Sequence, residues 1–208
     1  MTTPTLVPDG IICPEKFAKA CPKILWILKE TNGCADLRAY LNYSVTDYRN
    51  WARTWAKVAL LSYSLLTRQD FSKARQIVSA PQLHLRPLHD PQRQAVDEIM
   101  RQIAVMNIKK TAGLASAKFP EIKAAYRQHA TALWQQAAAV KPDIIFVACG
   151  EWQFRDEVAD DLNAYFARLN LPRPAFVSLP HPNDRRTSRE TYFELAQKQL
   201  ARQSFQLR

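Results

Sequence analysis

Four short apolar runs, separated by segments with helical spacing, constrain the fold of this chain more than any other feature. The runs span residues 24–28, 103–108, 143–149 and 175–179. Continuous apolar runs of this length are typical of strands buried on both faces, as in parallel sheets. Strands that alternate with helices imply parallel pairing through right-handed crossovers. We therefore predict an α/β fold, a three-layer αβα sandwich around a central, mainly parallel four-stranded sheet.

The segments between the runs predict helices. Residues 51–65 and 122–133 carry apolar side chains at spacings of three and four, which indicates helices that pack one face on the core. Near the end, Thr187-Ser-Arg-Glu190 has the pattern of a capping box, which predicts that a helix starts there. Residues 80–91 contain three prolines and are predicted to form a loop.

The length and composition indicate one globular domain. With 208 residues, 47% hydrophobic and 23% charged, the chain is neither disordered, collagenous nor a coiled coil. A chain of this length buries a full core as one domain. We expect a single domain over residues 1–208, with 1–22 as an irregular lead-in that packs on it.

The charge balance favours nucleic acid as a partner. The chain has 29 Lys+Arg against 19 Asp+Glu, a formal charge of +10, which raises the local concentration of polyanions. The first residues do not have the pattern of a signal peptide, and no apolar stretch approaches the length of a membrane span. We expect a cytoplasmic monomer that contacts no membrane.

The cysteines and histidines do not have metal-binding spacing. No CxxC pair is present, and no histidine partners lie at zinc spacing. We expect reduced thiols, a buried Cys149 at a strand end, and no metal or cofactor. The residues concerned are Cys13, Cys21, Cys34, Cys149, His84, His89, His129 and His181.

Polar side chains follow each apolar run. In open parallel sheets, ligands bind outside the carboxyl ends of the strands. Glu30 follows the first run, Asn107 lies at the end of the second, Gly150 and Glu151 follow the third, and His181 follows the fourth. Each alone is commonly a loop or turn residue. Together they predict a carboxylate, an amide and a histidine at one edge of the sheet, with several cations beside them.

At these residues the chain resembles the uracil-DNA glycosylase superfamily. Residues Leu28–Gly33 resemble its first motif, such as Gly-Glu-Ala-Pro-Gly, and Val105–Lys110 resemble its Asn-Val-Val-Lys stretch. Asp143–Gly150 is similar to the strand that follows in the family, and Leu179–Asn183 resembles the second catalytic motif, His-Pro-Ser. The resemblance covers residues 23–200 in order and spacing.

The chain also departs from the family pattern. Lys29 replaces the first glycine, Thr31-Asn32 replaces Ala-Pro, and Asn183 replaces the serine of the last motif. The cysteine spacing does not reproduce that of the iron–sulfur members, so we predict no cluster. These differences bear on which base is removed and on whether the chain is active.

The resemblance implies a monofunctional glycosylase of base-excision DNA repair that acts on a base flipped out of DNA. It implies that His181, as neutral imidazole, donates to the leaving base and that Glu30 orients the attacking water. Asn107 and Asn32 would contact the base, and Tyr43 would stack on it, with Tyr48 and Trp51 as rivals. The residues predicted to contact DNA phosphates are Lys29, Lys109, Lys110, Asn183, Arg185 and Arg186. Binding should weaken steeply as salt rises.

Two other interpretations stay open. A catalytically silent member of the same fold could bind DNA or a modified base, which the altered first motif favours. An enzyme of free nucleotides would have a glycine-rich phosphate loop, but the four glycines form neither GxGxxG nor GxxxxGK. The GxSxG elbow of serine hydrolases is also missing.

Overall fold

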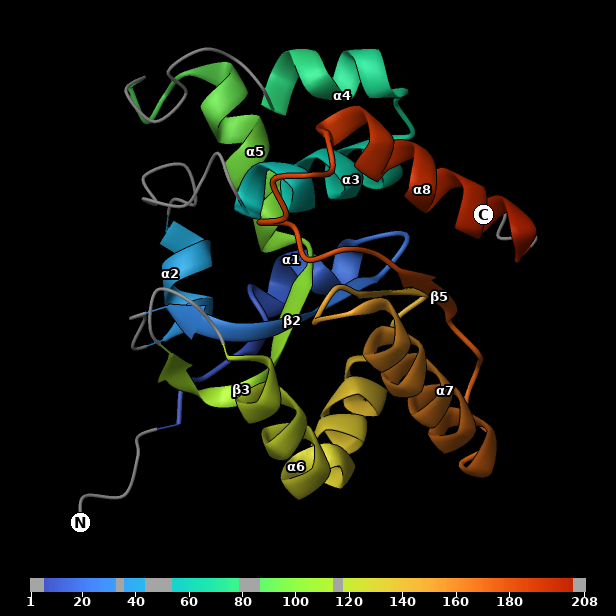
Figure 1. Cartoon of the computed structure of the whole chain (residues 1–208). Helices are drawn as coiled ribbons and strands as arrows, with labels where there is room; N and C mark the ends of the chain where they lie inside the picture. The colour runs from blue at the N-terminus through green and yellow to red at the C-terminus, as the bar shows by residue number, and fades with distance from the viewer. Residues whose placement is uncertain (1–5, 33–35, 44–53, 79–86, 114–117, 204–208) are drawn as a thin grey trace.

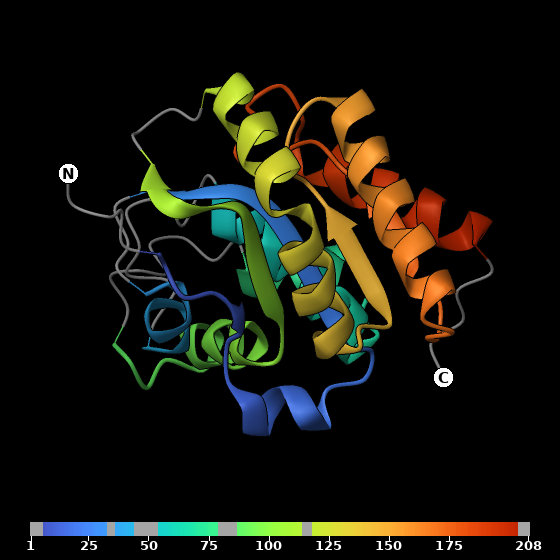
Figure 2. The ribbon, with the colours of Figure 1, turned by 90° about the horizontal axis from the view of Figure 1, so that it is seen from below.

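The computed structural model describes residues 6–32, 36–43, 54–78, 87–113 and 118–203. These residues form an α/β fold in which helices pack on both faces of one sheet (Figures 1 and 2). The strands are β1 (Gly10–Ile11), β2 (Ile24–Asn32), β3 (Ala104–Gly113), β4 (Ile144–Val147) and β5 (Ala175–Ser178). The helices are α1 (Pro14–Lys19), α2 (Leu37–Tyr43), α3 (Ala56–Thr67), α4 (Phe71–Val78), α5 (Pro91–Arg101), α6 (Phe119–Val140), α7 (Trp152–Arg168) and α8 (Arg189–Arg202).

The sheet has five strands in the order β1-β3-β2-β4-β5. Strands β3, β2, β4 and β5 are parallel and coincide with the four apolar runs, which confirms that part of the prediction. The sheet is nevertheless mixed, because β1 pairs antiparallel with β3 at its edge. Our prediction of four strands missed β1, since a strand of two residues leaves no apolar run in the sequence.

The two faces of the sheet carry separate apolar cores, which explains why the parallel strands are apolar throughout. Trp26 stacks on Phe146 at 4.3 Å between ring centroids, in the core that α2, α3, α4, α5 and α8 cover. Leu25 and Ile145, one residue away along the same strands, point into the other core with α1, α6 and α7. Side chains alternate across a strand, so both alternating sets must be apolar here.

The helices agree with the predicted segments except at their starts. Residues 122–133 lie within α6, and α3 covers the predicted 51–65 segment from Ala56 onward. Trp55 is buried, and Trp51 lies outside the described residues. Helix α8 is capped by Ser188, whose hydroxyl accepts the Thr191 N–H at 3.0 Å. The predicted cap, Thr187, instead donates to Asp184 at 2.8 Å.

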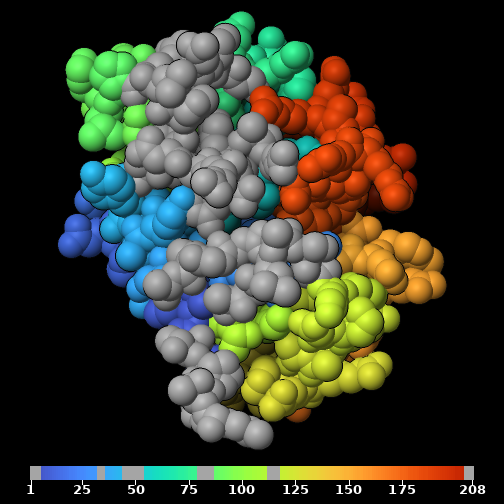
Figure 3. Space-filling view, turned by 60° about the vertical axis from the view of Figure 1, so that its left-hand side comes forward, coloured from blue at the N-terminus to red at the C-terminus, as the bar shows by residue number. Residues whose placement is uncertain are grey.

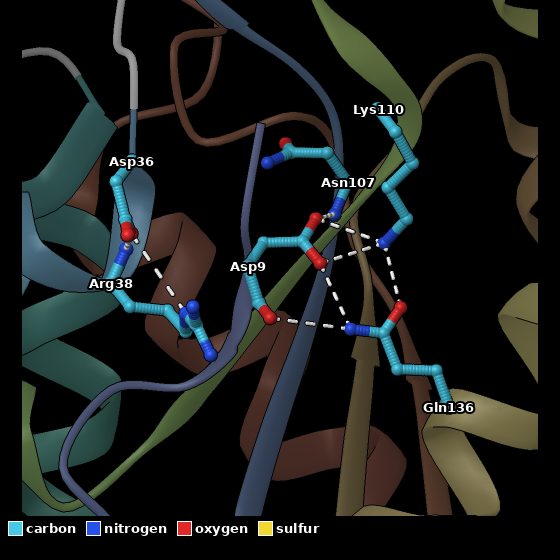
Figure 4. A network of polar contacts seen from close by, with 6 residues as sticks. All are labelled: Asp9, Asp36, Arg38, Asn107, Lys110 and Gln136. Atoms are coloured by element: carbon cyan, nitrogen blue, oxygen red, sulfur yellow. Dashed lines mark hydrogen bonds and ion pairs between the residues drawn. The ribbon is translucent and has the colours of Figure 1, made fainter. Parts of the chain in front are cut away.

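Residues 6–22 contain a strand and a helix and are therefore not irregular, although they pack on the domain as we expected. The strand and helix are β1 and α1, and the Asp9 carboxylate accepts the backbone N–H of Asn107 at 2.7 Å (Figure 4). The same carboxylate accepts from Lys110 Nζ at 2.8 and 2.9 Å and from Gln136 Nε2 at 3.0 Å. Buried polar contacts therefore hold this segment on β3 and α6.

The connections between strands reverse direction between β2 and β4, at a topological switch point of the sheet. The chain leaves β2 through α2–α5 on one face of the sheet and leaves β4 through α7 on the other. Neighbouring strands whose connections leave on opposite faces create the crevice in which ligands of parallel sheets bind. Pairing with β4 stops at Ile27, whereas β2 continues beside β3 as far as Asn32. Within the described ranges, no helix has the length and hydrophobicity required to cross a bilayer.

Candidate functional site at the carboxyl edge of the sheet

Glu30 is held in the sheet by an ion pair with the neighbouring strand. It lies opposite Lys109 in the parallel register, and Lys109 Nζ is 3.0 Å from Glu30 Oε2. The same ammonium is 2.9 Å from Oε2 of Glu121 in the first turn of α6. Its hydrogen bonds to Glu121 and Glu30 raise the pKa of Lys109. The hydrogen bond that Glu121 accepts from Lys109 lowers the pKa of Glu121. The Glu30 side chain is only 5% exposed.

Asn107 lies on the same face of the sheet as Glu30. Leu28 pairs with Asn107 in the register, and Leu28 belongs to the same core cluster as Val105. Because side chains alternate along a strand, Glu30 and Asn107 both point to that face. From the usual strand spacing and rise, their Cα atoms are about 8 Å apart. Asn107 is 2% exposed.

Three buried polar atoms in this part of the sheet have no hydrogen-bond partner. They are Nδ2 of Asn107, Oε2 of Glu30 and Oγ1 of Thr31. Glu30 Oε2 is nevertheless 3.0 Å from the Lys109 ammonium, within ion-pair distance. An unpaired buried polar atom costs about 1–3 kcal/mol, and such atoms are rare in folded proteins. Asn107 Nδ2 and Glu30 Oε2, which share one face of the sheet, offer a donor and an acceptor to a polar ligand.

His181 presents a single N–H donor. Its Nδ1 accepts the backbone N–H of Asn183 at 3.1 Å, so the proton of the neutral ring resides on Nε2. Burial, and then the charges of Lys29 and Lys57, lower the pKa of His181 to about 3, although Asp184 acts in the opposite direction. A pKa in this range keeps the ring neutral at physiological pH.

Lys57 holds the segment that carries His181. Its ammonium, on α3, donates to the carbonyls of Asp184 and Thr187, both at 2.7 Å. Lys57 is 7% exposed, and burial lowers its pKa. These contacts bind the segment that follows β5 to α3. The segment runs from the sheet edge toward α3 and lies near the end of β2 (Figure 1). The sequence analysis missed Lys57, although a lone lysine in an apolar helix is a signal.

Replacing Lys57 with methionine should loosen this segment. The variant leaves two carbonyls without their donor, so we expect the free energy of unfolding to fall by about 1–3 kcal/mol. Amide hydrogen exchange of residues 184–188 should become faster. Lys198→Met, on the exposed side of α8, is the matched control and should change neither. Unchanged exchange in Lys57→Met would show that Lys57 does not hold the segment.

Replacing Lys109 with methionine should destabilise the sheet edge. Glu30 would lose its counter-charge while staying buried, which we expect to cost about 1–3 kcal/mol at neutral pH in urea unfolding. Because the folded-state pKa of Lys109 is raised, the difference from the wild type should shrink as the pH rises above 10.5. Lys118→Met is the control, since Lys118 is 74% exposed and 3.9 Å from Glu121. Equal effects of the two variants would contradict this account.

The other residues that we predicted to contact the base lie at the surface, at the end of β2 or outside the described residues. Tyr43 is 74% exposed at the end of α2, so its ring lies at the surface. Tyr48 and Trp51 lie outside the described residues, and Asn32 ends β2. Helices α2, α6 and α8 all reach the face seen in Figure 3.

The predicted phosphate contacts divide into two groups. Asn183, Arg185 and Arg186 are exposed, and Lys29 is half-buried at the end of β2. Lys109 and Lys110 are instead bound to carboxylates, Lys109 to Glu30 and Glu121, and Lys110 to Asp9. These ion pairs hold both lysines within the fold, and their contact with DNA phosphates stays a prediction.

Glu30, Asn107 and His181, the three residues predicted to contact the base or the water, form two groups near the end of β2. Glu30 and Asn107 are neighbours on β2 and β3, and His181 lies near Lys29, the residue before Glu30. Among the described residues, no hydrogen bond or ion pair joins His181 to Glu30 or Asn107. A ligand that contacts all three would bridge the groups.

Cys149 is buried, as predicted, and burial raises the pKa of its thiol to about 12. Within the described residues, no group of three or more His, Cys, Asp or Glu side chains could hold a metal ion. Comparison of the chain with family models, curated proteins and solved structures found no match.

Proposed function

We propose that the chain is a DNA glycosylase that hydrolyses the N-glycosidic bond of uracil, or of a related damaged or modified base, flipped out of DNA. The observation that carries the proposal is the buried Asn107 amide, whose Nδ2 has no hydrogen-bond partner, on the same face of the sheet as the buried carboxylate of Glu30. The neutral His181 donor near the end of β2 adds to it. A flipped nucleobase carries donors and acceptors on one edge, which such a set matches.

Each group has a role in bond cleavage. The Asn107 amide offers both a donor and an acceptor to the base edge. As the glycosidic bond breaks, its electron pair goes to the base, and the His181 Nε2–H hydrogen bonds the oxygen on which negative charge develops. Water adds to the sugar carbon and loses a proton to Glu30, whose carboxylate Lys109 holds in place. The products are the free base and an abasic site.

The net charge of +10 supports a polyanionic partner. The exposed Asn183, Arg185 and Arg186 follow His181 directly, where they would contact the strand beside the extruded nucleotide. The three-layer αβα arrangement predicted from the sequence is compatible with helices on both faces of the sheet.

A panel of oligonucleotides, each with one altered base, tests the proposal. We expect the wild-type protein to form abasic sites in at least one strand containing uracil, hypoxanthine, xanthine or mismatched thymine. Binding should weaken as salt rises because phosphate contacts release counterions. Absence of base release across the whole panel, by protein shown to be folded, would overturn the proposal.

One observation favours the second candidate, a silent DNA- or base-binding module. The Lys109 ammonium pairs with Glu30, which occupies that carboxylate in the structure. The same panel separates the two functions, because a silent module would bind the strands tightly and in a salt-sensitive way without forming abasic sites.

A further inference from the structure

Arg155 is a half-buried cation that the base site does not use. It lies in the first turns of α7, just beyond the carboxyl end of β4. Its Nε and Nη1 atoms are buried without a hydrogen-bond partner, and among the described residues no carboxylate lies within ion-pair distance of it. Burial lowers the pKa of Arg155, and the charges of Cys149, Asp156, Tyr192 and Asp184 raise it. A buried guanidinium without a partner is costly, so a ligand is the natural partner.

Two lysines place further positive charge in the same region. The Lys29 charge lowers the pKa of both the Cys149 thiol and the His181 ring. The Lys57 charge also lowers the pKa of His181. Two of the three N–H donors of Lys57 are hydrogen bonded to the carbonyls of Asp184 and Thr187. Lys29 lies on β2 just beyond Ile27, the last residue paired with β4, Arg155 lies at the start of the helix that follows β4, and Lys57 binds the segment after β5.

The carboxylates near this group do not neutralise it. Asp156 is exposed. Asp184 is bound within its own turn, where Oδ2 accepts the Thr187 hydroxyl at 2.8 Å and Oδ1 accepts the Arg186 N–H at 3.1 Å. The three cations therefore leave an excess of positive charge in the crevice between β2 and β4, where ligands of parallel sheets bind.

We propose that Arg155, Lys29 and Lys57 form a subsite that binds a phosphate group. The two unpaired N–H donors of Arg155 suit bidentate contact with phosphate oxygens. This subsite lies on the β4 side of β2, whereas Asn107 and Glu30 lie on the β3 side. The phosphate comes either from the diester backbone of a strand or from the monoester of a free nucleotide.

Nuclear magnetic resonance of the arginine side chains tests the subsite with named probes. The Arg155 Nε–H resonance, identified by its absence in Arg155→Met, is followed during titration with inorganic phosphate. We expect a saturable shift. Two further titrations distinguish the sources: deoxyuridine monophosphate, and a five-nucleotide single strand without a terminal phosphate. Tighter binding of the nucleotide indicates a monoester source, and tighter binding of the strand indicates a diester source.

Variants decide whether Arg155 itself binds the phosphate. Arg155→Met should weaken phosphate binding by at least about tenfold. It should also raise the melting temperature, because it removes an unpaired buried charge. Arg168→Met, at the far end of α7 where the guanidinium lies over the Tyr165 ring, is the matched control and should bind as the wild type does. Lys29→Met should weaken binding in the same direction as Arg155→Met.

An unmoved Arg155 resonance with all three probes, or wild-type phosphate binding by Arg155→Met, would overturn the subsite. This outcome is separate from the fate of the glycosylase proposal. Phosphate binding without base release would leave the subsite standing, and base release without phosphate binding would refute the subsite alone.

Discussion

Replacing His181 with alanine is expected to lower the rate of base release about a hundredfold or more. The substitution removes the Nε2–H donor that the proposed mechanism places against the leaving base, and a single donor of this kind contributes a factor of that size in other enzymes. The fold should survive, because the Nδ1 contact of the ring stays within its own turn. Single-turnover release of uracil from a single strand measures the effect.

The pKa of His181 adds a second, independent readout. Since it is about 3, the ring should stay neutral, and no histidine step should appear in the rate of the wild type between about pH 5 and 8. Fold stability should decline as the pH falls below 6.5, because the unfolded chain takes up a proton that the folded ring does not. His129→Ala, exposed on α6, is the control. Full activity in His181→Ala would remove the proposed mechanism.

Replacing Asn107 with leucine is expected to abolish base release while making the protein more stable. Leucine has nearly the volume of asparagine plus a methyl group and leaves no polar atom buried without a partner. We expect the free energy of unfolding to rise by about 1 kcal/mol, provided that the pocket accommodates the extra volume. Base release should fall about a hundredfold or more, because the base edge loses its donor and acceptor. Urea unfolding and base release on the same sample measure both effects.

The control for this variant is Asn163→Leu, on the half-buried side of α7. It should leave base release unchanged. Retention of activity in Asn107→Leu would show that Nδ2 of Asn107 does not contact the substrate, whatever the change in stability.

The parallel strands and the residues at their ends could be predicted from the sequence. Buried parallel strands leave continuous apolar runs, and ligand sites in such sheets lie at the carboxyl ends. These two rules alone place Glu30, Asn107 and His181 at one edge. The register then adds that Glu30 and Asn107 share a face, which no pattern of residue types contains.

The polar contacts between distant segments could not be predicted. Asp9 holds Lys110 across 101 residues, and Lys57 holds Asp184 across 127. Such pairs do not recur at a fixed spacing in the sequence. From the sequence alone, Lys110 therefore resembled a residue that contacts phosphate, and Lys57 resembled an ordinary residue of an apolar helix. The exposure of Tyr43 could not be predicted either, because the exposure of an aromatic ring depends on how its helix packs.

A crystal structure of the Glu30→Gln variant with a uracil-containing single strand tests the central claim most directly. The account predicts a uracil ring flipped out of the strand, within hydrogen-bond distance of both Asn107 Nδ2 and His181 Nε2. A base bound elsewhere, or one that touches only one of these two side chains, would contradict it.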